Sequence, residues 1–403
     1  MKVLLIGSGG REHALGWKLA HSSRVKEVVS LPGNPGLAEL GPVVEGIDPT
    51  DVGAVAAMAR IHGVDLVVVG PEAPLASGVA DAVVRLGIPV FGPTRAAARL
   101  ESSKAFAKDV MTRAGVPTGG YAGFADPAAA REHIDRTEGP YVVKADGLAA
   151  GKGVLVTESR ADAKSWVDHW IDAGPVVVEE FLEGAEVSVF AVCTASRTVA
   201  LEPARDYKRL MDGDEGPNTG GMGSYSPVSD LPAGLVDETM ATVIRPTLEQ
   251  MSHDGNPFTG FLYAGLVLTE DGLKVLEFNV RLGDPEAQAI LPRMSGDLLE
   301  VLEGGQPEWS DDATVNVVLA APGYPTAPQR GAEIEGLNGD PGEGVIVFHA
   351  GTAVEGRKLF VDGGRVLNVV GIGPDLDRAR ERAYGAAERI TWPGMQFRRD
   401  IAS

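Results

Sequence analysis

Three polar residues at alternate positions, Glu277, Asn279 and Arg281, carry side chains suited to a metal-bound phosphate. In a strand they point to one face, because successive side chains alternate between faces. A carboxylate and an amide oxygen are hard ligands that suit Mg²⁺, and an arginine can brace a phosphate or an acyl phosphate. The apolar residues on the other face, which we expect in the core, are Leu276, Phe278 and Val280. The alternative is an exposed strand with a salt bridge, which does not explain the presence of Asn279.

A glycine-rich hairpin lies between two strands expected over residues 141–144 and 154–157. The first strand ends in Lys144, and the loop carries three further residues placed to touch a phosphate: Gly151, Lys152 and Gly153. Backbone N–H groups of such a loop can surround phosphate oxygens, and lysines add point charges. This is not a Walker A loop, since no helix follows and the GxxxxGK[ST] spacing is absent. A flexible hairpin without a ligand is the alternative.

The strand expected over residues 176–182 ends in two acids and two apolar residues. An extended hinge of this kind can pair its backbone with an adenine edge, while Phe181 and Leu182 flank the ring. Glu186 follows at a distance that suits ribose hydroxyls. A hairpin with solvated acids explains the same residues without a nucleotide. Together with the hairpin and the metal strand, however, this segment favours an enzyme that uses ATP to activate a carboxylate.

The first 100 residues alternate continuous apolar runs with helical segments. Strands are expected over residues 2–6, 27–31, 66–69 and 90–91, and helices over 12–20, 52–62 and 76–86. This pattern is typical of a parallel sheet covered on both faces, with ligands bound beyond the carboxyl ends of its strands. The first loop has Glu12 where a dinucleotide fingerprint has its third glycine, so NAD binding is disfavoured.

After residue 100 the expected pattern of helices and strands changes twice. After a helix at 104–114, short strands and two helices run to Val189, and longer strands follow with a long loop over 205–227. The elements expected nearest the carboxyl end are strands at 315–321 and 345–349 and a helix at 377–390.

The chain of 403 residues has a net charge of −20, which repels nucleic acid and anionic lipid, so we expect neither as a partner. No apolar run reaches the roughly 18 residues of a membrane-spanning helix. The single cysteine, Cys193, excludes an internal disulfide, and we expect it in the core of a strand. Without a targeting segment, these features favour the cytoplasm.

In this order, the segments resemble the ATP-grasp ligases and, among them, the phosphoribosylamine–glycine ligase family. The motifs that carry the resemblance span nearly the whole chain: GSGGREHA (7–14), PGNPG (32–36), VGPEAPL (69–75), LESSKAF (100–106), VVKADGLAAGKGV (142–154), EEFLEGAE (179–186), GPNTGGMGSYSP (216–227), GFLYAGL (260–266) and EFNVRLGDPE (277–286). The implied fold class is α/β and α+β multidomain. It comprises an open parallel α/β domain (1–100), an ATP-grasp domain (101–292) with a mobile small lobe at about 119–187, and a C-terminal mixed β domain (293–403).

The resemblance implies a ligase that joins glycine to 5-phosphoribosylamine in purine biosynthesis. ATP would phosphorylate glycine to glycyl phosphate, and the amine would then displace phosphate. Mg²⁺ is the implied metal, with Mn²⁺ as an alternative. No protein nucleophile is implied, since positioning and charge stabilisation supply the catalysis. Family members are often monomers, which favours a monomer here.

The resemblance also implies roles for individual residues. Those for ATP are Lys104, Lys144, Gly151, Lys152, Gly153, Glu179, Leu182 and Glu186, and those for the metal are Glu277 and Asn279. Those for the reacting centre are Arg281, Asp284, Glu286 and Asp206. Asp206 would help the 217–220 loop to hold glycine or the amine substrate. Those for phosphoribosylamine and glycine are Gly9, Gly10, Arg11, Glu12, Asn34, Pro71, Glu72, Asn218, Thr219 and Gly220.

One departure and three rivals bear on these expectations. Residues 170–175 form a short connection where family members carry a longer glycine-containing loop over the phosphates, so closure would fall to residues 147–153. A carboxylase acting on biotin or an aminoimidazole nucleotide would share the metal strand without GSGGREHA and GPNTGGMG. A non-catalytic nucleotide-binding regulator would be expected to lose Glu277, Asn279 or Arg281. The third rival is the disfavoured dinucleotide oxidoreductase.

Overall fold

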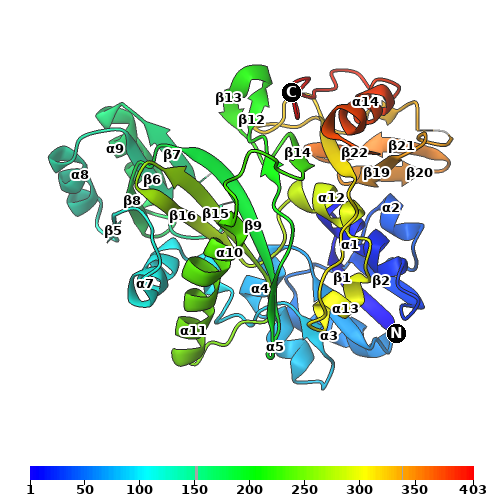
Figure 1. Cartoon of the computed structure of the whole chain (residues 1–403), viewed down its shortest axis with the longest axis horizontal. Helices are drawn as coiled ribbons and strands as arrows, with labels where there is room; N and C mark the ends of the chain where they lie inside the picture. Colours follow the sequence, from blue (N-terminus) through cyan, green and yellow to red (C-terminus); the bar gives the residue numbers. More distant parts are fainter. Residues whose placement is uncertain (150–152, 338) are drawn as a thin grey trace.

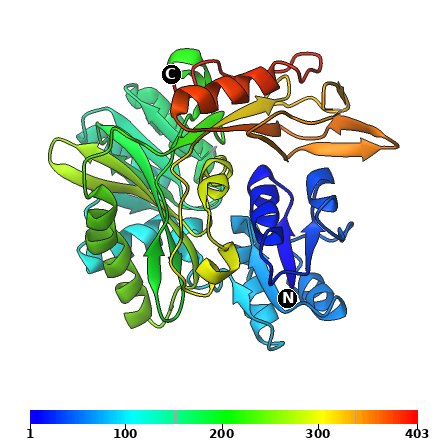
Figure 2. The same cartoon turned by 45° about the vertical axis from the view of Figure 1, so that its right-hand side comes forward.

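The computed structural model of the chain describes residues 1–149, 153–337 and 339–403. Figure 1 shows the N-terminal sheet (blue) and the C-terminal strands and helix (orange and red) on one side of the molecule. The sheets of the central region (cyan to green) lie on the other side, and Figure 2 shows the same division after rotation. This arrangement leaves a junction at which all three regions meet.

The N-terminal region is built on a parallel sheet, as predicted. Its strands are β1 (Lys2–Gly7), β2 (Glu27–Pro32), β3 (Leu66–Val69) and β4 (Val90–Phe91), in the order β2-β1-β3-β4. The helices are α1 (Gly10–Ala20), α2 (Pro35–Ala38), α3 (Val52–Ile61), α4 (Glu72–Ser77) and α5 (Val79–Val84). The single helix predicted over 76–86 is wrong, because Gly78 adopts a left-handed φ of 96° that separates α4 from α5.

A four-stranded antiparallel sheet with two helices on one face forms the small lobe. Helices α6 (Arg99–Ser102) and α7 (Lys104–Ala114) precede it, and its elements are β5 (Tyr121–Phe124), α8 (Pro127–Arg136), β6 (Tyr141–Ala145), β7 (Val154–Thr157), α9 (Arg160–Trp170) and β8 (Val176–Glu180). Ile134 of α8 and Val167 of α9 pack with Val143 and Val178 of the sheet. Side chains alternate along β6, so Lys144 points to the face that these helices leave uncovered.

The central sheet has the order β10-β9-β15-β16. Its strands are β9 (Ala185–Cys193), β10 (Thr198–Ala200), β15 (Gly260–Thr269) and β16 (Gly272–Asn279), with helices α10 (Leu235–Thr239), η2 (Met240–Ile244) and α11 (Arg245–His253) alongside. Cys193 is buried at the end of β9, as predicted.

The predicted alternation of β16 is wrong at Leu276, because this residue forms a β-bulge. Gly265 of β15 pairs with Glu277, whereas the next residue, Leu266, pairs with Val275, so Leu276 is the extra residue. The residues of β16 and its continuation that reach the core are Leu273, Val275, Phe278 and Val280. Leu276, which was predicted among them, is half-buried and lines the cavity described below.

The C-terminal region is antiparallel in every pairing among its described residues. Its main sheet has the order β11-β14-β17-β22-β19, from β11 (Arg205–Asp206), β14 (Gly223–Ser226), β17 (Ala313–Ala320), β22 (Arg365–Gly373) and β19 (Val345–His349). The other elements are β12 (Arg209–Met211), η1 (Asp212–Asp214), β13 (Glu215–Asn218), α12 (Glu286–Ile290), η3 (Leu291–Arg293), α13 (Leu298–Leu302), β18 (Glu333–Ile334), β20 (Thr352–Glu355), β21 (Lys358–Val361) and α14 (Leu376–Ala387).

The long loop predicted over 205–227 is wrong. This segment forms β11, the hairpin β12–β13 and β14, and β14 pairs with β17 across the predicted boundary at residue 292. Strands as short as Arg205–Asp206 carry no periodic signal. The second pairing partner of β14, the strand β17, lies about 90 residues further along the chain.

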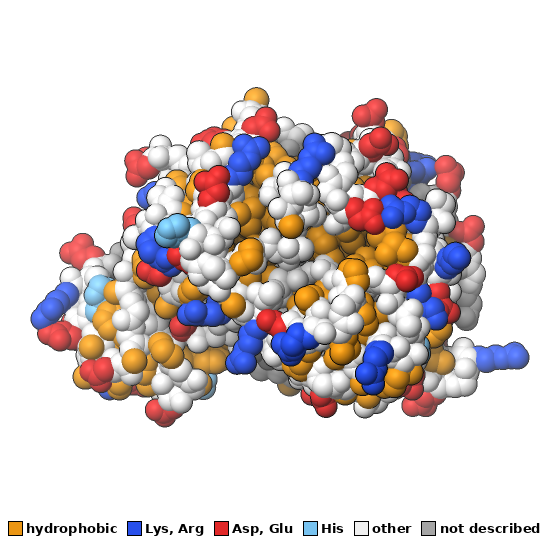
Figure 3. Space-filling view, turned by 90° about the horizontal axis from the view of Figure 1, so that it is seen from below, with side chains coloured by type: hydrophobic (Ala, Val, Ile, Leu, Met, Phe, Trp, Pro, Cys, Tyr) orange, Lys and Arg blue, Asp and Glu red, His pale blue; other side chains and the backbone are white. Residues whose placement is uncertain are grey.

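Among the described residues, no helix is both long and apolar enough to cross a lipid bilayer. On the face seen in Figure 3, lysine and arginine side chains are interspersed with acidic ones. The basic side chains visible there are therefore spread over the surface rather than gathered in one patch.

Candidate active site

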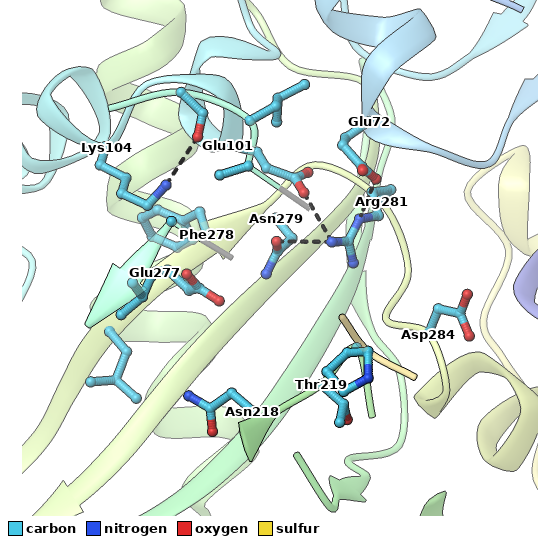
Figure 4. Close-up of a pocket in the computed structure, with 18 of the residues that line it drawn as sticks. Glu72, Glu101, Lys104, Asn218, Thr219, Glu277, Phe278, Asn279, Arg281 and Asp284 are labelled. Atoms are coloured by element: carbon cyan, nitrogen blue, oxygen red, sulfur yellow. Dashed lines mark hydrogen bonds and ion pairs between the residues drawn. The ribbon is translucent and has the colours of Figure 1, made fainter. Parts of the chain in front are cut away.

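A cavity of about 770 Å³ opens where the three regions meet. The predicted residues that line it are Arg11, Glu72, Lys104, Gly153, Glu179, Asn218, Thr219, Gly220, Glu277, Asn279, Arg281 and Asp284. Figure 4 shows Glu277, Asn279 and Arg281 in a row along β16 and its continuation, with Lys104 on one side of the row and Asn218 and Thr219 on the other. The structure thus brings together residues that are more than 250 positions apart in sequence.

The oxygen donors of β16 suit a hard divalent cation. Glu277 and Asn279 point to one face because they are two residues apart beyond the bulge. Burial opposes ionisation of Glu277, but Lys144, Lys208 and Lys104 outweigh it and lower the pKa of the carboxyl. Among the described residues, no group of three or more His, Cys, Asp and Glu side chains forms a metal site. Two protein oxygens leave coordination positions for phosphate oxygens and water, as Mg²⁺ prefers.

Arg281 is held by ion pairs and hydrogen bonds. Its Nε donates to Glu72 at 3.2 Å, and its Nη2 lies 3.0 Å from Glu101 and 3.2 Å from Oδ1 of Asn279. Its Nη1 donates to the carbonyl oxygen of Leu282 at 3.1 Å. Burial works against the charge, but Glu101 and Glu72 raise the pKa of Arg281 further. Glu101 was missed by the sequence analysis, although it belongs to the LESSK motif.

The start of α7 places Lys104 at the cavity. The hydroxyl of Ser103 caps this helix by accepting from the N–H of Phe106, and it also donates to Asp146 at 3.2 Å. Lys104 Nζ donates to the carbonyl oxygen of Gly147 at 3.1 Å. Burial lowers the pKa of Lys104. The lysine therefore connects the rigid helix to the glycine-rich loop, where phosphates are expected.

Glu179 lies between two lysines. Lys144 Nζ is 3.1 Å from Oε2 of Glu179, and Lys108 Nζ is 2.9 Å from the same oxygen. All three side chains are almost fully buried, with exposed fractions of 2% to 7%. Lys108 was missed, but its spacing of four residues from Lys104 places both on one helix face and was a usable signal.

The C-terminal region supplies part of the cavity wall. Arg365 Nη2 lies 2.9 Å from a carboxylate oxygen of Asp284, and its Nη1 donates to the carbonyl oxygens of Asp284 and Gly220. The N–H of Gly220 donates to Tyr324 Oη at 2.8 Å. Burial opposes ionisation of Asp284, but Arg365 and Arg11 lower the pKa of that carboxyl. No motif pointed to Arg365 or Tyr324.

Several predicted substrate residues support the N-terminal loops from outside the cavity. Glu12 is buried, accepts from the N–H of Gly9 at 2.7 Å and pairs with Arg11 at 2.6 Å. Asn34 caps α2 by accepting from Leu37 N–H at 2.9 Å, and its amide donates to the carbonyl oxygen of His349 at 2.8 Å. The predicted substrate residues absent from the described lining are Gly9, Gly10, Glu12, Asn34 and Pro71.

Other predicted residues also lie beside the cavity rather than in its described wall. Glu286 is buried near Ser188, and burial together with nearby Asp206 raises its pKa to about 7. Burial likewise raises the pKa of Asp206, while Glu186 pairs with Lys208. The remaining such residues are Lys144, whose Nζ reaches Glu179, and Leu182. Gly151 and Lys152 fall outside the described residues.

Two antiparallel sheets, a lysine-bearing cavity between them and a Glu-x-Asn-x-Arg strand define an ATP-grasp enzyme. The biotin carboxylase of Campylobacter jejuni, solved as a β-γ-ATP complex, shares this fold with a TM-score of 0.77 at 15% identity, over 98% of this chain and 92% of that one. At this identity the likeness establishes the fold alone.

The particular family follows from three matches that cover most of the chain. Family models described as phosphoribosylglycinamide synthetase match here: the N domain at residues 1–101, the ATP-grasp (A) domain at 102–287 and the C domain at 314–403. The chain belongs to the phosphoribosylamine–glycine ligase family, an ATP-dependent ligase family of purine biosynthesis.

Full-length relatives carry the same family name. The phosphoribosylamine–glycine ligase of Streptomyces coelicolor is 49% identical over 100% of this chain and 99% of its own length. That of Caulobacter vibrioides is 47% identical over 100% and 97%. The crystal structure of the Thermotoga maritima enzyme superposes with a TM-score of 0.86 at 38% identity and covers 100% of both chains.

Proposed function

We propose that this protein joins glycine to 5-phosphoribosylamine at the expense of ATP, giving glycinamide ribonucleotide, ADP and phosphate. The observation that carries the proposal is the convergence of Glu277, Asn279 and Arg281 with Lys104 in one cavity. The N-terminal loop residues Arg11 and Glu72 also line that cavity, as required of a ligase that joins two substrates at the expense of ATP.

In the first step, a carboxylate oxygen of glycine attacks the γ-phosphorus of ATP, and the bond to the β-phosphate bridging oxygen breaks. Lys104 and Lys144 hold the phosphates as fixed positive charges. Arg281 faces the transferred group and stabilises the charge of glycyl phosphate. Glu277 and Asn279 would hold Mg²⁺, which supplies charge neutralisation on the phosphates when bound.

In the second step, the amine of 5-phosphoribosylamine attacks the carbonyl carbon of glycyl phosphate. The C–N bond forms, the C–O bond to phosphate breaks, and the amine loses a proton. Arg11, Glu72 and the N-terminal loops position the amine substrate, while Asn218, Thr219 and Gly220 position glycine. Since no protein nucleophile takes part, orientation of the two reactants supplies most of the catalysis.

We place the nucleotide along β8. We assign Glu179 to adenine and Glu186 to the ribose, with Gly151, Lys152 and Gly153 over the phosphates. Mn²⁺ as an alternative to Mg²⁺, a monomeric state and a cytoplasmic location complete the proposal. The acidic net charge of −20 and the single buried cysteine support the last two of these.

The test is release of phosphate from Mg-ATP with glycine and freshly prepared 5-phosphoribosylamine. We expect turnover that requires both substrates and yields glycinamide ribonucleotide in equal amount to ADP. Turnover that does not depend on glycine would overturn the assignment. Bicarbonate in place of glycine tests the rival carboxylase activity, and we expect no turnover with it.

A further inference from the structure

Arg281 has two carboxylate partners that differ in depth and origin. Glu101 follows the N-terminal sheet at the start of the ATP-grasp region, and its side chain is 8% exposed. Its carboxylate also accepts from the backbone N–H of Val280 at 2.8 Å. Glu72 begins α4 in the N-terminal region, lines the cavity and is 28% exposed. Figure 4 shows the two acids approaching Arg281 from the same side.

These contacts use nearly every donor of Arg281. A guanidinium has five N–H groups. Nε–H goes to Glu72, one Nη1–H goes to the Leu282 carbonyl, and Nη2 serves Asn279 and Glu101. One Nη1–H is left for a ligand. A bidentate grip on an acyl phosphate needs two N–H groups on one edge of the guanidinium, and the free Nη1–H points away from the Nε edge. A grip through Nε and Nη2 therefore requires Glu72 to leave Nε and the ligand to share Nη2 with its present partners.

Of the partners, Glu72 is the one that a substrate can draw away. It sits in the wall where the proposed function places 5-phosphoribosylamine, and its carboxylate accepts hydrogen bonds from amines and hydroxyls, which that substrate carries. Glu101 is enclosed and tied to the backbone of Val280, so removing it from Arg281 would strand a buried charge.

We propose that Glu101 is the fixed positioning partner of Arg281 and Glu72 an exchangeable one. Binding of the amine substrate moves Glu72 off Nε, which opens the Nε–Nη2 edge of Arg281 to the acyl phosphate. Without the amine, Glu72 keeps its hydrogen bond with Arg281 Nε, and glycyl phosphate forms slowly. The enzyme thereby avoids making an anhydride that water would hydrolyse to glycine and phosphate. This inference rests on the proposed function and deepens it.

The experiment compares Glu72→Gln with Glu101→Gln. ADP formation is measured with glycine and Mg-ATP alone, and again with 5-phosphoribosylamine, together with the ratio of ADP to glycinamide ribonucleotide. Glu72→Gln weakens the hold on Nε, so we expect amine-independent ADP formation to rise about 10-fold, equivalent to about 1.4 kcal/mol. The ratio of ADP to product should rise above one.

Glu101→Gln keeps an acceptor for Val280 N–H but removes the charge that fixes Arg281. We expect kcat to fall about 100-fold in both assays, with KM for ATP within about twofold. Glu101→Asp should recover part of kcat. A structural role alone would lower the thermal midpoint and leave kcat of the folded enzyme unchanged.

Two results would overturn the inference. One is a Glu72→Gln variant that folds and shows no rise in amine-independent ADP formation. The other is an equal rise in Glu101→Gln. If Glu72→Gln does not fold, Glu72→Asp, which keeps the charge but withdraws it from Nε, replaces it with the same readout. A wild-type protein without glycine-dependent turnover would instead refute the proposed function, so the two failures are distinguishable.

Discussion

Arg365 and Asp284 form an ion pair at 2.9 Å between the C-terminal sheet and the loop that follows the metal strand. Both side chains are largely buried, at 20% and 16% exposed. The same guanidinium bonds the carbonyl oxygen of Gly220. One residue of the C-terminal region therefore fixes two loops of the candidate site at once.

Arg365→Met should impair catalysis more than its loss of folding stability alone would explain. It leaves Asp284 without its nearest positive charge and frees the Gly220 loop, so we expect a loss of about 3 kcal/mol in the free energy of unfolding. The KM for glycine should rise and kcat should fall about 10-fold or more. Arg330→Met is the matched control, because Arg330 pairs with Asp362 on the surface at 66% exposure. Equal effects of the two substitutions would refute the role of Arg365.

Glu277→Gln should abolish turnover while leaving the fold intact. The amide keeps the size of the side chain but removes the charge that Mg²⁺ and the neighbouring lysines require. We expect kcat to fall at least about 100-fold. Thermal unfolding should keep its midpoint, and adding Mg²⁺ should no longer raise the affinity for ATP. Full activity in this variant would exclude Glu277 as a metal ligand.

Lys108→Met should weaken ATP binding without touching the reacting groups. Glu179 would keep Lys144 but lose the lysine at 2.9 Å, so its position and charge balance would change. We expect KM for ATP to rise about 10-fold, equivalent to about 1.4 kcal/mol, with kcat nearly unchanged. The control is Lys164→Met, whose partner Asp135 is a half-exposed residue of the same lobe. An unchanged KM in Lys108→Met would remove Glu179 from the adenine assignment.

The protein should lose stability as the pH falls from 7 to 5, partly through His13 and His349. Burial lowers the pKa of His13 to about 3 and that of His349 to about 4. Unfolded histidines, at a pKa of about 6.5, bind protons first, so each group costs about 2 kcal/mol of stability at pH 5. This loss continues until the pH falls through the folded values.

Denaturant unfolding at pH 7 and pH 5 measures this effect. His13→Gln should reduce the difference between the two free energies of unfolding by about 2 kcal/mol. His253→Gln, at an 85% exposed residue, serves as the control and should leave the difference unchanged. A His13→Gln variant with the wild-type difference would contradict the prediction.

Sequence reasoning succeeded where one local signal was sufficient. Continuous apolar runs predicted the parallel N-terminal sheet, and the alternation after Leu276 predicted that Glu277 and Asn279 share a face. The predicted residues of the cavity came mostly from motifs at strand ends, where side chains from several loops converge. These features depend on neighbours within a few residues.

The failures concern contacts between distant segments. Arg365 and Tyr324 reach the site only because β22 packs beside β17, which no local pattern reveals. Glu12 and Asn34 also satisfy backbone donors and acceptors of the loops that hold them, a role that their motifs did not indicate, and their roles toward substrate stay predictions. The strands within 205–227 were missed because they are too short for a periodic pattern, and because β14 also pairs with β17, far along the chain.

The bulge at Leu276 changes which positions of the metal strand face the core. Odd-numbered Leu273 and Val275 reach the core before it, and even-numbered Phe278 and Val280 reach the same core after it. Deleting Leu276 would restore a regular ladder and leave Glu277 and Asn279 facing the cavity, whereas deleting a single residue on either side of the bulge would turn the two faces of the strand over. Evolution or design can therefore shorten this strand by one residue at the bulge, but elsewhere along it only in steps of two.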